Sequence, residues 1–185
     1  HWANRHHLDH YVFRGAEVTG VDLAETIRAD LTQALTGKRA NYNRVFTTNG
    51  IACTSASVIA ATQGFTELDA IGNDQIGDIR DAHLLLACFN AWQPGVFALS
   101  AWHLLGMLPV SDDTVAELIA GGDTRWLHRG AHDLIDADPS ATVSSSGMPR
   151  GRSLYGSIIE QLGDPESFAS QLKEILRIRK RHTID

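Results

Sequence analysis

A chain of 185 residues that is 43% hydrophobic and 21% charged has the composition of an ordinary globular domain, which excludes a disordered chain or a coiled coil. A net charge of −6 argues against binding to the phosphates of a nucleic acid, and no apolar run reaches the roughly 18 residues that a membrane-spanning helix needs. We therefore expect no nucleic-acid partner, no membrane partner and a cytoplasmic location, where Cys53 and Cys88 stay as buried free thiols.

The first half of the chain is expected to be helical. A helix over residues 21–36 is predicted because Thr19 can cap its start and Gly37 can end it. Small residues over 51–63 predict a second, closely packing helix. A third is predicted over residues 73–92, where Ile79 and His83 share one side.

The segment after the third helix is expected to be a strand. Pro94 and Gly95 separate the helix from residues 96–99, which form a short apolar run without polar alternation. Such a run is typical of a parallel strand covered on both faces, so the function is expected in the loop just beyond it, over residues 100–106.

A long excursion is predicted over residues 110–163, with short helices over 114–120 and 125–135 and the polar run 144–149. The last helix is expected to begin at Asp164 as N-cap, with Pro165 in its first position.

Three pieces of the chain, in this order, resemble the C-terminal part of the catalytic barrel in the α-amylase family, glycoside hydrolase family 13. Residues 2–14 (WANRHHLDHYVFR) resemble its strand-seven motif. Residues 82–87 (AHLLLA) and 93–96 (QPGV) resemble helix seven entering strand eight, and 164–168 (DPESF) through 178–181 (IRKR) resemble helix eight. Within the family, Arg150 and Tyr155 in 148–155 (MPRGRSLY) favour the trehalose-synthase-like branch of maltose α-D-glucosyltransferases.

The resemblance implies an α/β chain that is a fragment of a (β/α)8 TIM barrel, from about strand seven to helix eight, and mostly helical as it stands. Residues 1–185 would form one partial catalytic domain that lacks the N-terminal strands of the barrel. The implied activity is that of a retaining enzyme on an α-glucoside such as maltose or an α-glucan, by hydrolysis or transglucosylation, with maltose-to-trehalose isomerisation preferred. The nucleophile and the acid would lie upstream, so the chain alone is expected to be inactive.

The resemblance also implies roles for individual residues. Asp9 would be the catalytic carboxylate that grips sugar hydroxyls and stabilises the oxocarbenium-like transition state. The implied substrate-binding residues are His7, His6, Arg14, Trp102 and Arg150. No cofactor and no catalytic metal is implied, and a structural calcium is left open.

Two other classes of function compete with the enzyme. His6, His7 and His10 could share a metal with Asp9, although Arg5 would repel a cation. The apolar helix faces could instead belong to a non-catalytic helical interaction module.

Overall fold

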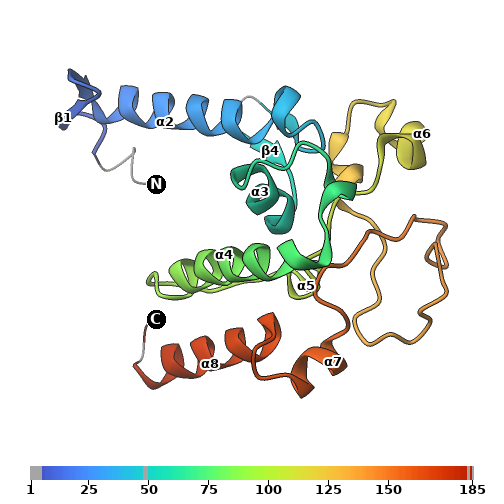
Figure 1. The fold of residues 1–185 in the computed structure, drawn as a ribbon. Coiled ribbons are helices and arrows are strands. Elements are labelled where there is room, and N and C mark those ends of the chain that lie inside the picture. Colours follow the sequence, from blue (N-terminus) through green and yellow to red (C-terminus); the bar gives the residue numbers. More distant parts are fainter. Residues whose placement is uncertain (1–5, 48–49, 183, 185) are drawn as a thin grey trace.

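The computed structural model describes residues 6–47, 50–182 and 184, so the first residues of the strand-seven segment, 1–5, lie outside the described part. The described chain is mixed α/β, about half helical, with two small antiparallel sheets. Helices α2, α4 and α8 lie in three layers, with α3 between α2 and α4 (Figure 1). Within the described residues no barrel is formed, and no helix is both long and apolar enough to cross a membrane.

The N-terminal segment forms a β-hairpin instead of a barrel strand. Strand β1 (His10–Phe13) pairs with β2 (Ala16–Thr19) in antiparallel register. Arg14 (φ 53°) and Gly15 (φ 81°) form the two-residue turn. Positive φ at both central positions gives the turn a twist that matches that of the paired strands. Glycine adopts positive φ without steric cost, which explains Gly15 at the second position. The assignment of residues 2–14 to a parallel strand is therefore wrong for the described part.

Helix α2 (Gly20–Leu35) confirms the first predicted helix to within one residue at each end. Its start is fixed by a capping box, in which the Thr19 side chain accepts from the backbone of Asp22 and the Asp22 carboxylate accepts from the backbone of Thr19. The helix has an apolar stripe of residues spaced by four, Leu23, Ile27, Leu31 and Leu35, which remains partly or largely exposed. Gly20 is the buried residue of the helix.

The predicted helix over residues 51–63 begins four residues late. Residues Arg44–Thr47 form β3 and Gly50–Ala52 form β4, which pair in a second hairpin after the short 3₁₀ helix η1 (Gly37–Arg39). Helix α3 then runs from Ser55 to Thr62, because Thr54 and Ser57 form a capping box that starts the helix there.

Helix α4 (Asn73–Ala91), reached through η2 (Leu68–Ala70), confirms the third predicted helix. The predicted strand over residues 96–99 is wrong, because no strand forms there and Val96 is 97% exposed. Gly95 has a φ of 107°, and the carbonyls of Gln93 and Gly95 accept from Arg179 of α8 instead of from a neighbouring strand. The turn is therefore bonded to a helix, and the apolar residues after it form an extended loop.

The excursion from residue 110 is mostly irregular. It contains η3 (Asp112–Val115), α6 (Ala116–Ile119) and η4 (Thr124–His128), after the single turn of α5 (Ala101–Leu104). The helix expected over 114–120 is thus split in two, and the helix expected over 125–135 is wrong beyond η4. Gly130 follows η4, and a Cβ there would lie 3.1 Å from the backbone nitrogen of Gly151, so glycine allows the two segments to approach closely.

The C-terminal helices begin at serine caps. Helix α7 (Ile158–Gly163), which the sequence reading missed, is capped by Ser157 with Glu160. Helix α8 (Phe168–Arg181) is capped by Ser167, so the predicted cap at Asp164 is wrong. The Asp164 carboxylate instead accepts from the backbone of Glu166, which holds residues 164–167 in a turn.

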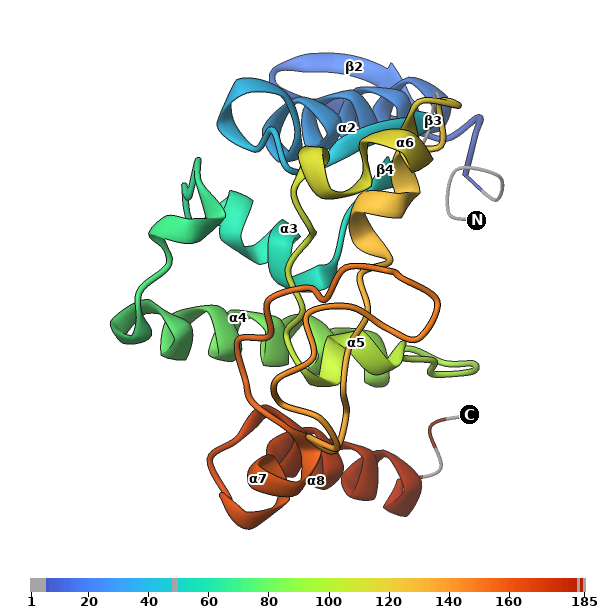
Figure 2. The same cartoon turned by 90° about the vertical axis from the view of Figure 1, so that its right-hand side faces the viewer.

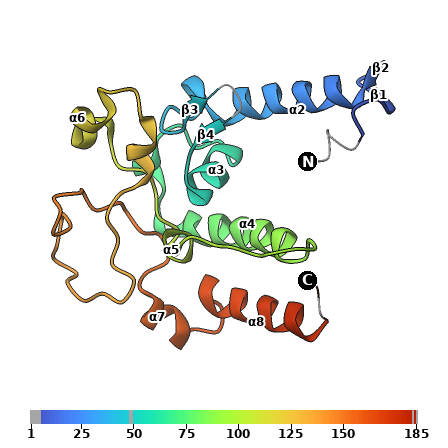
Figure 3. The same cartoon turned by 180° about the vertical axis from the view of Figure 1, so that it is seen from behind.

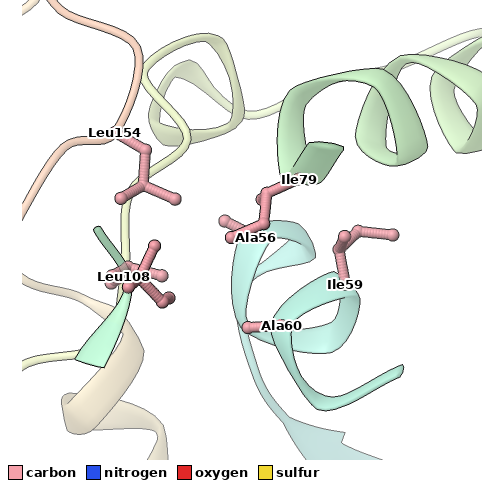
Figure 4. Packing of buried hydrophobic residues seen from close by; sticks show 7 residues of the cluster. Ala56, Ile59, Ala60, Ile79, Leu108 and Leu154 are labelled. Atoms are coloured by element: carbon pink, nitrogen blue, oxygen red, sulfur yellow. The ribbon is translucent and has the colours of Figure 1, made fainter. Parts of the chain in front are cut away.

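Three buried clusters lie among the described residues, of which one, formed by Val110, Val115 and Leu127, belongs to the excursion. The other two join α4 to its neighbours. Ile59 and Ala60 of α3 pack with Ile79 of α4, and Leu108 and Leu154 belong to the same cluster (Figure 4). In the second cluster, Ala87 of α4 packs with residues of α8, among them the fully buried Phe168. Helix α4 therefore contributes to both clusters and is the centre of the packed part.

Candidate functional site

The structure separates the predicted site residues into two groups. Asp9, His6, His7 and Arg14 lie next to or within the β1–β2 hairpin. Trp102 is in α5 and Arg150 in the excursion. The hairpin lies at one end of α2, and the loops of the excursion lie at the other end of the molecule (Figures 1 and 3). The structure therefore does not bring the two groups together.

At the hairpin end, the Asp9 carboxylate is exposed and already bonded. Its Oδ2 lies 2.7 Å from His6 Nδ1 and 3.4 Å from the Tyr11 hydroxyl. The Asp9 carbonyl accepts from the Gly20 nitrogen at 2.9 Å, and a Cβ on Gly20 would collide with the His6 carbonyl. The start of α2 thus fixes the backbone that carries Asp9.

The neighbouring residues of the hairpin form surface ion pairs. Arg14 Nη2 lies 2.6 Å from the Asp30 carboxylate of α2, and His10 Nδ1 lies 3.4 Å from Glu17. His7 is exposed on the same segment. Across the described ranges, no three residues of the types His, Cys, Asp and Glu lie close enough to hold a metal ion. The geometry gives the histidine metal site no support.

At the loop end, Trp102 lies between two histidines. Its ring centroid is 5.9 Å from that of His103 and 6.2 Å from that of His132, and both contacts are edge-to-face. His132 was not singled out from the sequence. The half-buried Trp102 therefore fixes the position of His132 more directly than it presents a free stacking face.

Arg150 is bonded mainly to the loop that precedes it. Its Nη1 donates to the carbonyls of Asp138, Pro139 and Ala141 at 3.0 to 3.3 Å, and its Nη2 lies 3.6 Å from the Asp136 carboxylate. These bonds fix the conformation of the loop over residues 136–141. Only some of the N–H groups of the Arg150 guanidinium are left to contact a ligand.

His132 stands between two cavities, which we call together the His132 cleft. The larger has a volume of about 1010 Å³ and the smaller about 290 Å³. Ala131, His132 and Ser144 line both. The other polar and aromatic side chains of the cleft are Asp113, Thr114, Glu117, Trp126, Arg129, Asp133, Asp138, Ser146 and Arg150.

Backbone contacts between distant segments form the floor of the His132 cleft. The Ala131 nitrogen donates to the Pro149 carbonyl at 2.7 Å, and the Gly151 nitrogen donates to the Ala131 carbonyl at 3.0 Å. A Cβ on Gly151 would lie 2.9 Å from the Leu108 carbonyl, so only glycine allows this close approach. Figure 2, viewed from this end, shows the loops of the excursion in front of α4 and α5.

Three charged side chains of the cleft, those of Asp133, Arg129 and Arg150, have partners within the protein. Backbone N–H groups, first that of Asp138, lower the pKa of Asp133, which therefore stays ionised. The guanidinium of Arg129 lies 5.2 Å from the centre of the Trp126 ring. An aromatic ring, an imidazole, hydroxyls and ionised carboxylates together can hold a polyhydroxylated, uncharged molecule by hydrogen bonds and by contact with its C–H face.

Trp126, Arg129 and His132 are the residues of this site that the sequence reading missed. The signal for them is the run Trp126, His128, Arg129 and His132 inside the long excursion, where recognition side chains are denser than a simple connection needs. Comparison with known proteins gave no match to a family model, to a curated protein or to a solved structure.

Proposed function

We propose that this chain is part of a retaining enzyme that acts on α-glucosides, and that it contacts the sugar at the His132 cleft. The reaction is hydrolysis or transfer of an α-glucosyl unit, with conversion of maltose into trehalose as the preferred variant. The resemblance of residues 2–14, 82–96 and 164–181 to the α-amylase family supports the reaction class. We also propose that residues 1–185 are a fragment of a (β/α)8 barrel, that they form one partial catalytic domain, and that the enzyme is cytoplasmic.

The observation that carries the proposal is the chemistry of the His132 cleft. Maltose is neutral, has hydroxyls that both donate and accept, and has apolar C–H faces. The cleft offers the matching groups: the Trp126 ring, the His132 imidazole and the carboxylates of Asp113 and Glu117. Its volume also falls within the range of small-molecule sites.

In this proposal the residues of the chain bind the sugar, and the nucleophile and the acid lie outside the chain. Retaining cleavage needs a nucleophilic carboxylate and a carboxylic acid, which the resemblance assigns to strands outside this chain. His132 and Trp126 would hold the ground-state sugar, Trp102 would hold the His132 ring in position, and Arg150 would hold the loop around it. The resemblance gives Asp9 a role in the transition state, with His6, His7 and Arg14 around it. These residues lie at or beside the hairpin, at the other end of the molecule, so in this proposal they do not contact the sugar held in the cleft (Figures 1 and 3).

Steady-state kinetics on maltose with the enzyme that carries this chain test both assignments. His132→Ala should raise KM by up to about ten-fold, the effect of losing one hydrogen bond to an uncharged group. Asp9→Asn should change neither kcat nor KM, because the hairpin beside Asp9 lies at the other end of the molecule from the cleft (Figures 1 and 3).

His182→Ala, the same substitution at the exposed end of α8, is the matched control and should change neither parameter. Unchanged kinetics in the folded His132→Ala variant would reject the cleft as the sugar site. A large fall in kcat in Asp9→Asn would support instead the catalytic role that the resemblance implies for Asp9.

The helical interaction module keeps one specific observation in its favour. Leu85, Phe89 and Trp92 lie along one face of α4 and are 72%, 63% and 50% exposed. If this face binds another helix, Phe89→Ser should weaken an association that analytical ultracentrifugation detects. A monomeric chain that shows no association at any concentration would remove this alternative.

A further inference from the structure

A second cavity lies away from the His132 cleft, between α4, the extended loop after it and α5. Its volume is about 380 Å³. One wall is apolar and includes Leu86, Phe97 and Leu99. Two histidines, His83 and His103, line the cavity together with Ser55, Asn90 and Gln93. We call it the His83 cavity.

His83 is held rigidly at the base of this cavity. It is buried on α4, and its Nδ1 lies 3.1 Å from the Tyr155 hydroxyl. Its ring packs on that of Phe168 with 4.5 Å between centroids. The side chain therefore has one nitrogen bonded to Tyr155 and a fixed ring plane, which is the preorganisation that a binding site requires.

His103 contributes the second imidazole. Its ring centroid lies 6.1 Å from that of His83 in an edge-to-face arrangement. Its Nδ1 is buried and has no hydrogen-bond partner among the described residues. A buried polar atom without a partner costs free energy, so a group that bonds to it from the cavity would be stabilised there.

The cavity favours an uncharged occupant. Among the described residues that line it, none carries a formal charge at neutral pH. Burial, together with the neighbouring His103, lowers the pKa of His83 to about 4, and burial also lowers the pKa of His103. Both imidazoles are neutral at pH 7, and each has one donor and one acceptor nitrogen. Nδ1 of His83 is already bonded to Tyr155, so only its Nε2 is left for an occupant, while Nδ1 of His103 is without a partner among the described residues.

We propose that the His83 cavity is a separate binding site for a neutral cyclic polyol of monosaccharide size, such as a single pyranose. The apolar wall would contact the C–H face of the ring, and the imidazoles, Asn90 and Ser55 would bond its hydroxyls. An anion finds no cationic side chain there. A transition metal would find two imidazoles, one already bonded to Tyr155, and no third ligand of the usual types in the described part of the chain. The volume lies at the lower end of small-molecule sites, which fits one ring.

Nuclear magnetic resonance of the 185-residue chain with labelled histidine rings tests this site. Titration with methyl α-D-glucopyranoside should shift the ring signals of His83 and His103 along a saturable curve. Inorganic phosphate and Zn²⁺ should leave these signals unchanged at the same concentrations. Shifts with phosphate or Zn²⁺ but not with the glucoside would overturn the proposal.

Matched variants separate this site from the His132 cleft. Asn90→Ala, an exposed position on α4, should weaken the glucoside response of the His83 ring roughly two- to ten-fold without affecting the fold. His103→Leu should abolish it. His132→Ala should leave it unchanged even if the sugar role of the His132 cleft fails. A response that persists undiminished in both Asn90→Ala and His103→Leu would contradict the assignment.

Discussion

Helices α2 and α4 both have apolar residues at helical spacing in the sequence but have different surroundings in the fold. Helix α4 buries Ile79, His83 and Ala87 between α3 on one side and α8 on the other. Helix α2 has a better start, with a complete capping box, yet Leu31 in its apolar stripe is 53% exposed. Periodicity therefore predicts that a helix forms, while the neighbours of a helix decide how much stability it contributes.

The two groups of candidate site residues also differ in how firmly the packed part of the molecule supports them. Trp102 and His132 lie on loops fixed to the packed part by close backbone contacts. Asp9 lies next to an exposed hairpin that is fixed mainly to the start of α2. A rigid support favours precise ligand contacts, which is why we place sugar binding at the loop end.

The largest expected effect comes from removing the aromatic ring between α4 and α8. Phe168 is fully buried against His83 and Tyr155, so Phe168→Ala should lower the free energy of unfolding by about 3 to 5 kcal/mol. Leu31→Ala on α2 should change it by about 0.5 kcal/mol or less, as expected for an exposed position. Urea denaturation measures both, and equal losses would show that α2 is as firmly packed as α4.

Acidification should weaken the packed part through its buried histidine. Burial lowers the pKa of His83 to about 4, below its ordinary value of 6.5. As the pH falls below 6.5, the unfolded chain binds a proton that the folded chain excludes, so stability falls until the pH approaches 4. At about 1.4 kcal/mol per pH unit, His83 alone contributes a loss of about 2 kcal/mol between pH 6.5 and 5.

The control for this pH dependence is His83→Gln, which removes the titrating group. His128 is also buried, with a pKa lowered to about 4, so part of the slope should remain in that variant. Unfolding free energies measured from pH 7 to 4.5 should therefore show a shallower slope in His83→Gln. An identical slope in the two proteins would mean that His83 is not protected from solvent.

Two glycine substitutions should act in opposite directions. Gly106 has a φ of 59°, and a Cβ there would lie 2.6 Å from the Tyr155 ring. Gly106→Ala should therefore lower the free energy of unfolding by about 1 to 2 kcal/mol or more. Gly77 lies inside α4 with no atom within 4 Å of an added Cβ, so Gly77→Ala should stabilise the protein by about 0.5 to 1 kcal/mol. Thermal unfolding compares them, and a stabilising Gly106→Ala would contradict the packing of Tyr155.

The smallest expected change in the melting temperature of the whole chain comes from removing the cap of α2. Thr19→Ala removes the side-chain cap of α2 and should lower the stability of the first turn of that helix by about 1 kcal/mol. Since α2 is weakly coupled to the buried clusters, amide exchange should accelerate in α2 while the melting temperature of the whole chain changes little. A clear fall in that temperature would indicate stronger coupling than the exposed stripe suggests.

Local signals in the sequence predicted the helices better than the connections. Thr19 with Asp22 located the start of α2, and the apolar spacing through Ile79 and His83 located α4. The strand over 96–99 failed because an apolar run does not specify its partner, and here Arg179 from α8 bonds the turn that precedes it. The β1–β2 hairpin was missed because its turn signal, Arg14 followed by Gly15, was read as part of a family motif.

The candidate site was only partly predictable. Trp102 and Arg150 were identified as binding residues, and both lie at the loop end next to His132 or in the wall of its cleft. His132 itself depends on a long-range approach of Gly130 to Gly151, which no local pattern contains. The His83 cavity was hidden for the same reason, since His83 and Tyr155 are far apart in the sequence.

Mapping maltose onto the backbone amides of the chain by nuclear magnetic resonance tests the central claim most directly. The account predicts saturable shifts in the amides around Trp126, His132 and Ser144, which line the His132 cleft, and no shifts over residues 6–19 of the hairpin end. Shifts confined to residues 6–19, or none at all in a folded chain, would contradict the placement of the sugar site at the loop end.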